Sequence, residues 1–258
     1  MNAIGHHETL WSKLYPGNQT TVSCFQNAVL GAQASLELDA KQRKRTVWRM
    51  DGGAGSDANF DWLLAQGYQL HAKGLSNRRA GALAQQVRRW NAYDDVWLAE
   101  VKSPFDFPQP VRVFVLRRSK KGKFVHSYFV STLTLSSKRH FWQAYNQRGA
   151  AEVEQFRQDK SGLAMAIRRK RSFNGQSAYI LLTDLAHNLL ADFKLNALTD
   201  SRFADFGLKR IVRDLLKMPG RVVFDGPQLK RVELLSQNQF AEPLIICLER
   251  YISRRFGD

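Results

Sequence analysis

The chain has 258 residues, of which 44% are hydrophobic, so it is long enough for one large or two small domains around a buried core. Its 39 Lys and Arg residues outnumber 23 Asp and Glu residues, which gives a formal charge of +16 and favours a polyanionic partner, nucleic acid ahead of an anionic membrane surface. With only two cysteines, the chain has neither a disulfide framework nor a cysteine metal cluster. Because the sequence shows no signal peptide and no apolar span, we expect a cytoplasmic protein that is not inserted in a membrane.

The N-terminal part is predicted to alternate between strands and helices. Residues 6–18 resemble the end of a strand closed by a Pro-Gly turn, and residues 21–38 carry apolar positions at helical spacing. A basic run, KQRKR at 41–45, leads into the segment 46–74. That segment predicts a strand, a helix capped by Ser56 and a second strand, which is the pattern of a parallel pair in an α/β domain.

The rest of the chain is predicted to contain a strand-rich region, a helical region and a C-terminal hairpin followed by a helix. A basic helix precedes three strand-like segments within residues 75–135, two of them joined by the hairpin-like turn SKKGK. Residues 136–193 return to helical spacing. The stretch RVVFDGPQLKRVELL at 221–235 is typical of a β-hairpin with an Asp-Gly turn, and the tail ending at Asp258 is helix-like.

The first candidate for chemistry is Asp51, which follows the apolar strand TVWRM and begins the glycine-rich turn DGGAGS. An acid at a strand end is well placed for catalysis. The turn itself, at the start of a helix, is able to cradle a phosphate, but an ordinary strand-to-helix corner explains it equally well. The chain contains no GxxxxGK[ST] loop, no GxSxG elbow and no CxxC pair.

The second candidate is the stretch YNQRGAAEVEQFRQDK at residues 145–160. On an ideal helix Tyr145, Arg148 and Glu152 fall within an arc of about 60°, and Lys160 lies about 60° beyond Tyr145 on the other side. Such a face is able to bind a metal through the acid and a phosphate through the cations and the phenol. A solvated face with an Arg148–Glu152 ion pair is the alternative interpretation.

Taken together, the two stretches resemble the DDE transposases of bacterial insertion sequences, whose ribonuclease-H-like core carries a Y-x2-R-x3-E-x6-K signature on the helix of the third catalytic acid. The resemblance implies that Asp51 is the second acid and Glu152 the third. Both would bind Mg²⁺ or Mn²⁺, while Tyr145, Arg148 and Lys160 would contact DNA. The implied fold is a ribonuclease-H-like mixed α/β sheet flanked by helices, with a β-rich insertion.

The signature is imperfect in one place. Seven residues separate Glu152 from Lys160 where the family has six, and Asp159 stands at the family's position for the lysine. Glu154 is therefore a rival for the third acid. It lies about 180° from Tyr145 on an ideal helix, however, so we prefer Glu152.

The family's first acid has no counterpart in this sequence. The only aspartate before Asp51 is Asp39, which lies in a polar stretch ahead of the strand. We therefore expect a core that lacks its first strand or strands. The expected segments are the first part of the truncated core at 1–74, the β-rich insertion at 75–135, the helical completion of the core at 136–200 and a basic C-terminal tail region at 201–258.

The expected function is DNA cleavage and strand transfer of an insertion sequence by two-metal phosphoryl transfer. We expect this truncated form to be inactive, because one acid is missing. The main alternative is a non-catalytic DNA-binding remnant of a transposase. A different metal nuclease or an RNA-binding module would need a third acid elsewhere, such as Glu8, or an aromatic stacking sheet. The expected partner is double-stranded DNA, both element ends and target, and a homodimer is left open.

Overall fold

The computed structural model describes residues 1–3, 6–165, 167, 170–235 and 237–256, without the side chains of 2, 148–155 and 254–256. The chain divides into two compact units, which we describe separately. Unit 1 comprises Met1 and Tyr15–Ala150, and unit 2 comprises Asn2–Leu14 and Ala151–Asp258. The boundary falls within one helix, so α5 contributes its first half to unit 1 and its second half to unit 2.

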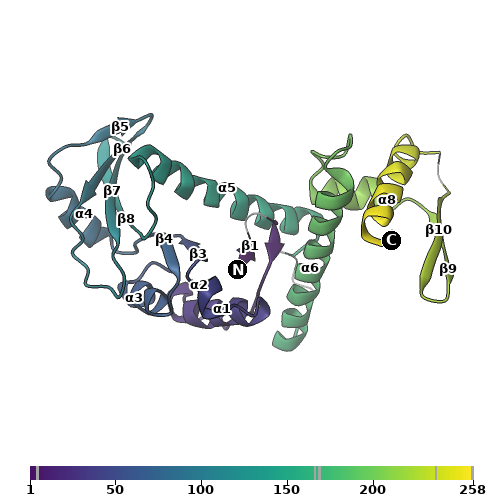
Figure 1. Ribbon diagram of the computed structural model, residues 1–258, viewed down its shortest axis with the longest axis horizontal. Coiled ribbons are helices and arrows are strands. Elements are labelled where there is room, and N and C mark those ends of the chain that lie inside the picture. The colour runs from purple at the N-terminus through teal and green to yellow at the C-terminus, as the bar shows by residue number, and fades with distance from the viewer. Residues whose placement is uncertain (4–5, 166, 168–169, 236, 257–258) are drawn as a thin grey trace. The chain divides into compact units, whose positions relative to one another are not determined.

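Figure 1 labels most of the elements of both units. Unit 1 contains α1 (Thr21–Ser35), α2 (Ala40–Arg43), β3 (Val47–Met50), α3 (Asp57–Ala65), β4 (Gln69–Lys73), α4 (Asn77–Gln85), β5 (Asn91–Tyr93), β6 (Val96–Val101), β7 (Arg112–Lys120), β8 (Lys123–Ser131) and the start of α5 (Lys138–Gly162). Unit 2 contains β1 (Asn2–Ala3), β2 (Glu8–Thr9), the rest of α5, α6 (Phe173–Phe193), η1 (Lys194–Leu198), α7 (Leu208–Arg210), η2 (Ile211–Leu215), β9 (Gly220–Asp225), β10 (Gln228–Leu234) and α8 (Ala241–Phe256).

Unit 1 is built on a six-stranded mixed sheet in the order β3-β4-β8-β7-β6-β5. Strands β3 and β4 are parallel and are connected through α3, whereas every other neighbouring pair is antiparallel. The predicted strand, helix, strand unit is thus confirmed. Its helix begins where expected, because the Ser56 side chain accepts a hydrogen bond from Asn59 N. The helix ends at Ala65 with Gln66 as its C-cap, and the next residue, Gly67, has a φ of 85° that favours glycine.

Helices cover both faces of this sheet. Helices α1, α3 and α4 pack on one face, around a core that includes Phe25, Phe60 and Leu83. The first part of α5 packs on the other face, where Phe141 and Tyr145 meet Phe129 and its neighbours on β6, β7 and β8. Alternate strand residues therefore enter two different cores, as the period-2 geometry of a strand requires.

Unit 2 has its own core, formed by the end of α6, the segments η1, α7 and η2, and α8. The predicted Asp-Gly hairpin is present as β9 and β10, and Gly226 adopts a φ of 56° in its turn. The region between α6 and β9 was not predicted. Two of its segments, η1 and η2, are π-helical, so their apolar positions do not repeat at the 3.6-residue period of an α-helix.

The remaining predicted elements are present with shifted limits. The basic helix after β4 ends at Gln85, and the C-terminal helix begins at Ala241, within the predicted tail region. Strands β7 and β8 form the predicted hairpin around SKKGK, with Lys121 and Gly122 at φ values of 52° and 75°. The result is a mixed α/β fold, as expected from the sequence. The division at 74/75, 135/136 and 200/201 stays a prediction.

Candidate active site

Asp51 begins the turn that follows β3, and its carboxylate is exposed. Its Oδ1 atom accepts a hydrogen bond of 2.8 Å from Gly53 N, which holds the side chain over its own turn. The turn is fastened to the end of β4, because Leu75 N donates to the Gly55 carbonyl at 2.8 Å. A Cβ atom on Gly55 would lie 2.0 Å from the Lys73 carbonyl oxygen, so this close approach requires glycine.

The parallel register places Asp51 at a defined point of the sheet. Arg49 is opposite His71, and the next residues, Met50 and Ala72, are also opposite each other. Met50 and Ala72 point into the core on the α1, α3 and α4 side. Because side chains alternate along a strand, Arg49 and His71 point to the face that α5 covers, and Asp51 is the first residue after β3.

His71 anchors α5 on this face of the sheet. Its ring is fully buried, Nδ1 lies 3.0 Å from Ser131 Oγ, and the rings of Phe141 and Tyr145 approach it edge-on. Burial lowers the pKa of His71 to about 4, opposed by the Phe141 carbonyl and reinforced by the Arg49 guanidinium. His71 is therefore neutral near pH 7, and its role is to pack against α5 rather than to supply a charge.

A direct hydrogen bond also joins β3 to α5. The Arg49 Nη1 atom donates to the Ala144 carbonyl at 2.9 Å. Ala144 immediately precedes Tyr145, the first residue of the signature. The strand that leads to Asp51 and the helix turn that begins the signature are thus in contact within unit 1.

Tyr145 is 8% exposed, and its ring packs against Phe129 and Trp142 with centroid distances of 4.7 and 6.0 Å. Its assignment to DNA contact stays a prediction. Arg148 and Glu152 fall within helix α5, but their side chains lie outside the described part of the structure. Lys160 is exposed in the last turn of α5.

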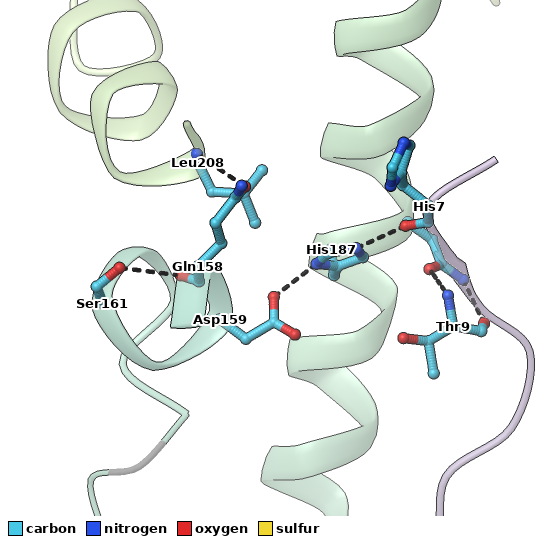
Figure 2. A network of polar contacts seen from close by, with 8 residues as sticks. His7, Thr9, Gln158, Asp159, Ser161, His187 and Leu208 are labelled. Atoms are coloured by element: carbon cyan, nitrogen blue, oxygen red, sulfur yellow. Dashed lines mark hydrogen bonds and ion pairs between the residues drawn. The ribbon is translucent and has the colours of Figure 1, made fainter. Parts of the chain in front are cut away.

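Asp159, which occupies the family's lysine position, is buried in unit 2 (Figure 2). Its Oδ1 atom lies 2.5 Å from His187 Nδ1 on α6, and His187 Nε2 lies 2.7 Å from the His7 carbonyl oxygen. Both ring nitrogens face acceptors, so the imidazolium is the form that satisfies them. Burial lowers the pKa of His187, but the Asp159 carboxylate and the His7 carbonyl outweigh it and raise the pKa above its usual value.

No pattern in the sequence predicts this pair, because its two residues belong to different helices. The same face of α6 binds the N-terminal segment at a second point. Asn188 donates through Nδ2 to the Thr9 carbonyl at 2.9 Å and accepts through Oδ1 from Thr9 N at 2.8 Å. His7 and Thr9 are therefore held on α6 by two adjacent side chains, His187 and Asn188.

Asp39, the only aspartate before Asp51, has a structural role. It is the N-cap of α2, where its Oδ1 atom accepts a hydrogen bond of 2.7 Å from Gln42 N. This capping contact fits the conclusion that Asp39 is not a catalytic acid.

Among the residues with described side chains, no group of three or more His, Cys, Asp or Glu residues is arranged to bind a metal ion. Asp51 nevertheless has the donor chemistry that Mg²⁺ prefers, since it is an exposed carboxylate with a fixed orientation.

Exposed basic side chains gather at the β7–β8 hairpin of unit 1. Arg118, Lys120, Lys121 and Lys123 are all exposed there. The neighbouring Arg117 guanidinium lies over the rings of three aromatic residues, Trp90, Trp97 and Phe124, at 4.6, 5.1 and 4.5 Å from their centroids. Cations beside aromatic rings suit a nucleic acid, which offers phosphates and bases together.

The helices of the described residues include none that is long and apolar enough to cross a membrane.

An acid at the end of a parallel strand, on a mixed sheet flanked by helices, is compatible with a ribonuclease-H-like transposase. The family comparison agrees, because residues 5–250 match the model for the transposase DDE domain, group 1. The chain therefore belongs to the DDE transposases. No curated protein matches the sequence.

Proposed function

We propose that this chain is the DNA-cleaving part of an insertion-sequence transposase, in which Asp51 and Glu152 are two of the catalytic acids. The observation that supports the proposal is the position of Asp51 directly after β3, whose residue Arg49 contacts α5. The same helix bears the sequence Y-x2-R-x3-E, and its described part already contacts the strand that leads to Asp51.

The helical repeat extends this argument along α5. Phe141 and Tyr145 face the sheet in the described part of the helix. Positions 148 and 152 follow Tyr145 by three and seven residues, so they continue the same stripe of an ideal helix at about 100° per residue. Position 154 lies on the opposite side. Helix geometry therefore favours Glu152 over Glu154 as the acid that joins Asp51.

Mg²⁺ or Mn²⁺, when bound by these carboxylates, would activate the attacking oxygen and stabilise the leaving oxygen. The chain's own contribution is to fix the ligands. Gly53 N orients Asp51, and Leu75 N ties the turn to β4. A cation at position 148 or 160 would bind phosphate oxygens, since guanidinium and ammonium groups pair with them through charge-assisted hydrogen bonds.

We further propose that the 258-residue chain alone cleaves DNA poorly. Two carboxylates supply half the charge of a pair of divalent cations, so the second cation would be bound weakly. A non-catalytic DNA-binding protein is the second candidate function. It is favoured by the exposed basic side chains of the β7–β8 hairpin, which suit binding to phosphates without any chemistry.

The test is nicking of supercoiled plasmid DNA by the 258-residue chain with Mg²⁺ or Mn²⁺. We expect DNA binding with little or no nicking. Weak nicking that Asp51→Ala abolishes would support the catalytic candidate, and binding without any nicking would support the second. Robust cleavage lost in Asp51→Ala would show that another residue completes the site and would contradict the proposed weakness. Absence of DNA binding would reject both candidates.

A further inference from the structure

The end of β4 carries a lysine that no part of the transposase signature includes. Lys73 follows His71 by two residues, as Asp51 follows Arg49 by two. The parallel register of β3 and β4 ends with Met50 opposite Ala72, so Asp51 and Lys73 are the residues that come next along the two neighbouring segments. The carboxylate and the ammonium group therefore belong to neighbouring strand ends at one edge of the sheet.

The side chain of Lys73 runs along the turn that Asp51 begins. A Cβ atom on Gly52 would lie 3.7 Å from Lys73 Cδ and 3.9 Å from Lys73 Cε. The aliphatic part of the lysine thus lies beside the residue after Asp51. The backbone around it is held in place, because Gly74 N donates to the Tyr128 carbonyl at 2.9 Å and Leu75 N donates to the Gly55 carbonyl at 2.8 Å.

From this placement we infer that Lys73 is a positioning residue that binds a phosphate of the DNA backbone beside Asp51. A lysine ammonium acts as a point charge toward phosphate and binds it without reading the bases. The inference rests on the proposed function and adds to it the residue that would hold the phosphate next to the catalytic acid.

The test measures binding of a short blunt-ended DNA duplex of arbitrary sequence, with EDTA present, over a series of salt concentrations. Each phosphate neutralised on duplex DNA contributes about −0.9 to the slope of log K against log salt. For Lys73→Met we expect a slope less steep by about 0.9, which corresponds to an affinity about eightfold lower at 0.1 M salt. Methionine keeps most of the aliphatic contact with Gly52, and Lys73→Arg should retain the wild-type slope.

The matched control is Lys102→Met, because Lys102 is an exposed lysine that follows β6 in the same sheet. A double-mutant cycle adds a second readout. Asp51→Asn should change the effect of Lys73→Met, because it removes a negative charge beside the phosphate that Lys73 binds. The effects of Asp51→Asn and Lys102→Met should add. A thermal unfolding curve checks that each variant is folded, and Lys73→Gln replaces Lys73→Met if methionine prevents folding.

The outcomes separate the two proposals. If wild-type binding does not change with salt, the DNA-binding function itself fails, whatever Lys73 does. If wild-type binding weakens steeply but Lys73→Met keeps the wild-type slope, the function stands and the role of Lys73 is overturned. A loss of slope in Lys73→Met together with additivity toward Asp51→Asn would also overturn it, because the bound phosphate would then lie away from Asp51.

Discussion

At the scale of single residues, two glycines allow the backbone at the end of β4 to pack closely against its neighbours. Gly55 allows the Asp51 turn to approach the Lys73 carbonyl, and Gly74 allows the backbone to pass under Tyr128. A Cβ atom on Gly74 would lie 1.9 Å from the Tyr128 ring, which is itself buried. The ring cannot move without disturbing the core, so the strand end depends on these glycines.

We therefore predict that Gly74→Ala lowers the free energy of unfolding by about 1–3 kcal/mol, the usual cost of overpacking. The matched control is Gly81→Ala in the interior of α4, where a Cβ atom meets nothing within 4 Å. Alanine there should raise the free energy of unfolding by about 0.5–1 kcal/mol, because it is the better helix former. Chemical denaturation of both variants measures the difference. Equal effects of the two substitutions would contradict the close packing at Gly74.

Some residue roles were readable in the sequence and others were not. Asp51 and the N-cap Ser56 are local features, since a strand end and a cap depend on a few neighbouring residues. The Asp159–His187 pair depends on how two helices pack, which no short sequence pattern encodes. The same holds for the position of Lys73 beside the turn that Asp51 begins, because it depends on how β3 and β4 pair.

At the scale of elements, the buried pair ties α5, α6 and the N-terminal segment together within unit 2. Asp159 comes from α5, His187 from α6 and the accepting carbonyl from His7. Asp184, one turn before His187 on α6, also faces the pair. Burial raises the pKa of its carboxyl group, and the nearby Asp159 carboxylate raises it further, while a hydrogen bond from Ser12 and the charge of His187 oppose them.

This arrangement predicts a pH-dependent stability of unit 2. The pKa of His187 is raised in the folded state, so its contribution is complete below the unfolded value of about 6.5 and is lost as the pH rises through the folded pKa. Asp159→Asn should therefore lower the free energy of unfolding by about 3 kcal/mol at pH 6 and by clearly less at pH 9. Denaturation curves at both pH values provide the measurement.

A surface pair supplies the control for this prediction. Glu233 lies 2.9 Å from the Arg231 guanidinium, and the side chain of Arg231 is 63% exposed. Glu233→Gln should change stability by no more than about 1 kcal/mol at either pH, as is typical of exposed ion pairs. An equal loss in Asp159→Asn at pH 6 and pH 9 would mean that His187 is not charged in the folded protein.

The elements of unit 1 were largely predictable because their signals are local. The alternation of apolar residues, the Ser56 cap and the turn SKKGK correspond to α3, β4 and the β7–β8 hairpin. Residues 194–216 contain no pattern that predicts their secondary structure. Their core residues Leu198, Phe203 and Ile211 are spaced by π-helical and irregular backbone, which follows no fixed period.

At the scale of the whole molecule, the residues that match the DDE transposase family belong to both units. Unit 1 supplies Asp51 and the basic hairpin, whereas Glu152 and Lys160 belong to the half of α5 in unit 2. The family match and the charge of +16 point to DNA as the partner. The central claim is that Asp51 and Glu152 belong to one site although 101 positions separate them.

The most direct measurement of that claim is crosslinking by a short bismaleimide between cysteines at these positions, in a chain carrying Cys24→Ser and Cys247→Ala. Carboxylates that share a metal ion must lie within a few ångström of it, so the variant Asp51→Cys with Glu152→Cys should crosslink readily. The matched variant Asp51→Cys with Glu154→Cys should react far more slowly, because position 154 lies on the opposite side of an ideal helix. No crosslink in the first variant, or a faster one in the second, would contradict the assignment of Asp51 and Glu152 to one active site.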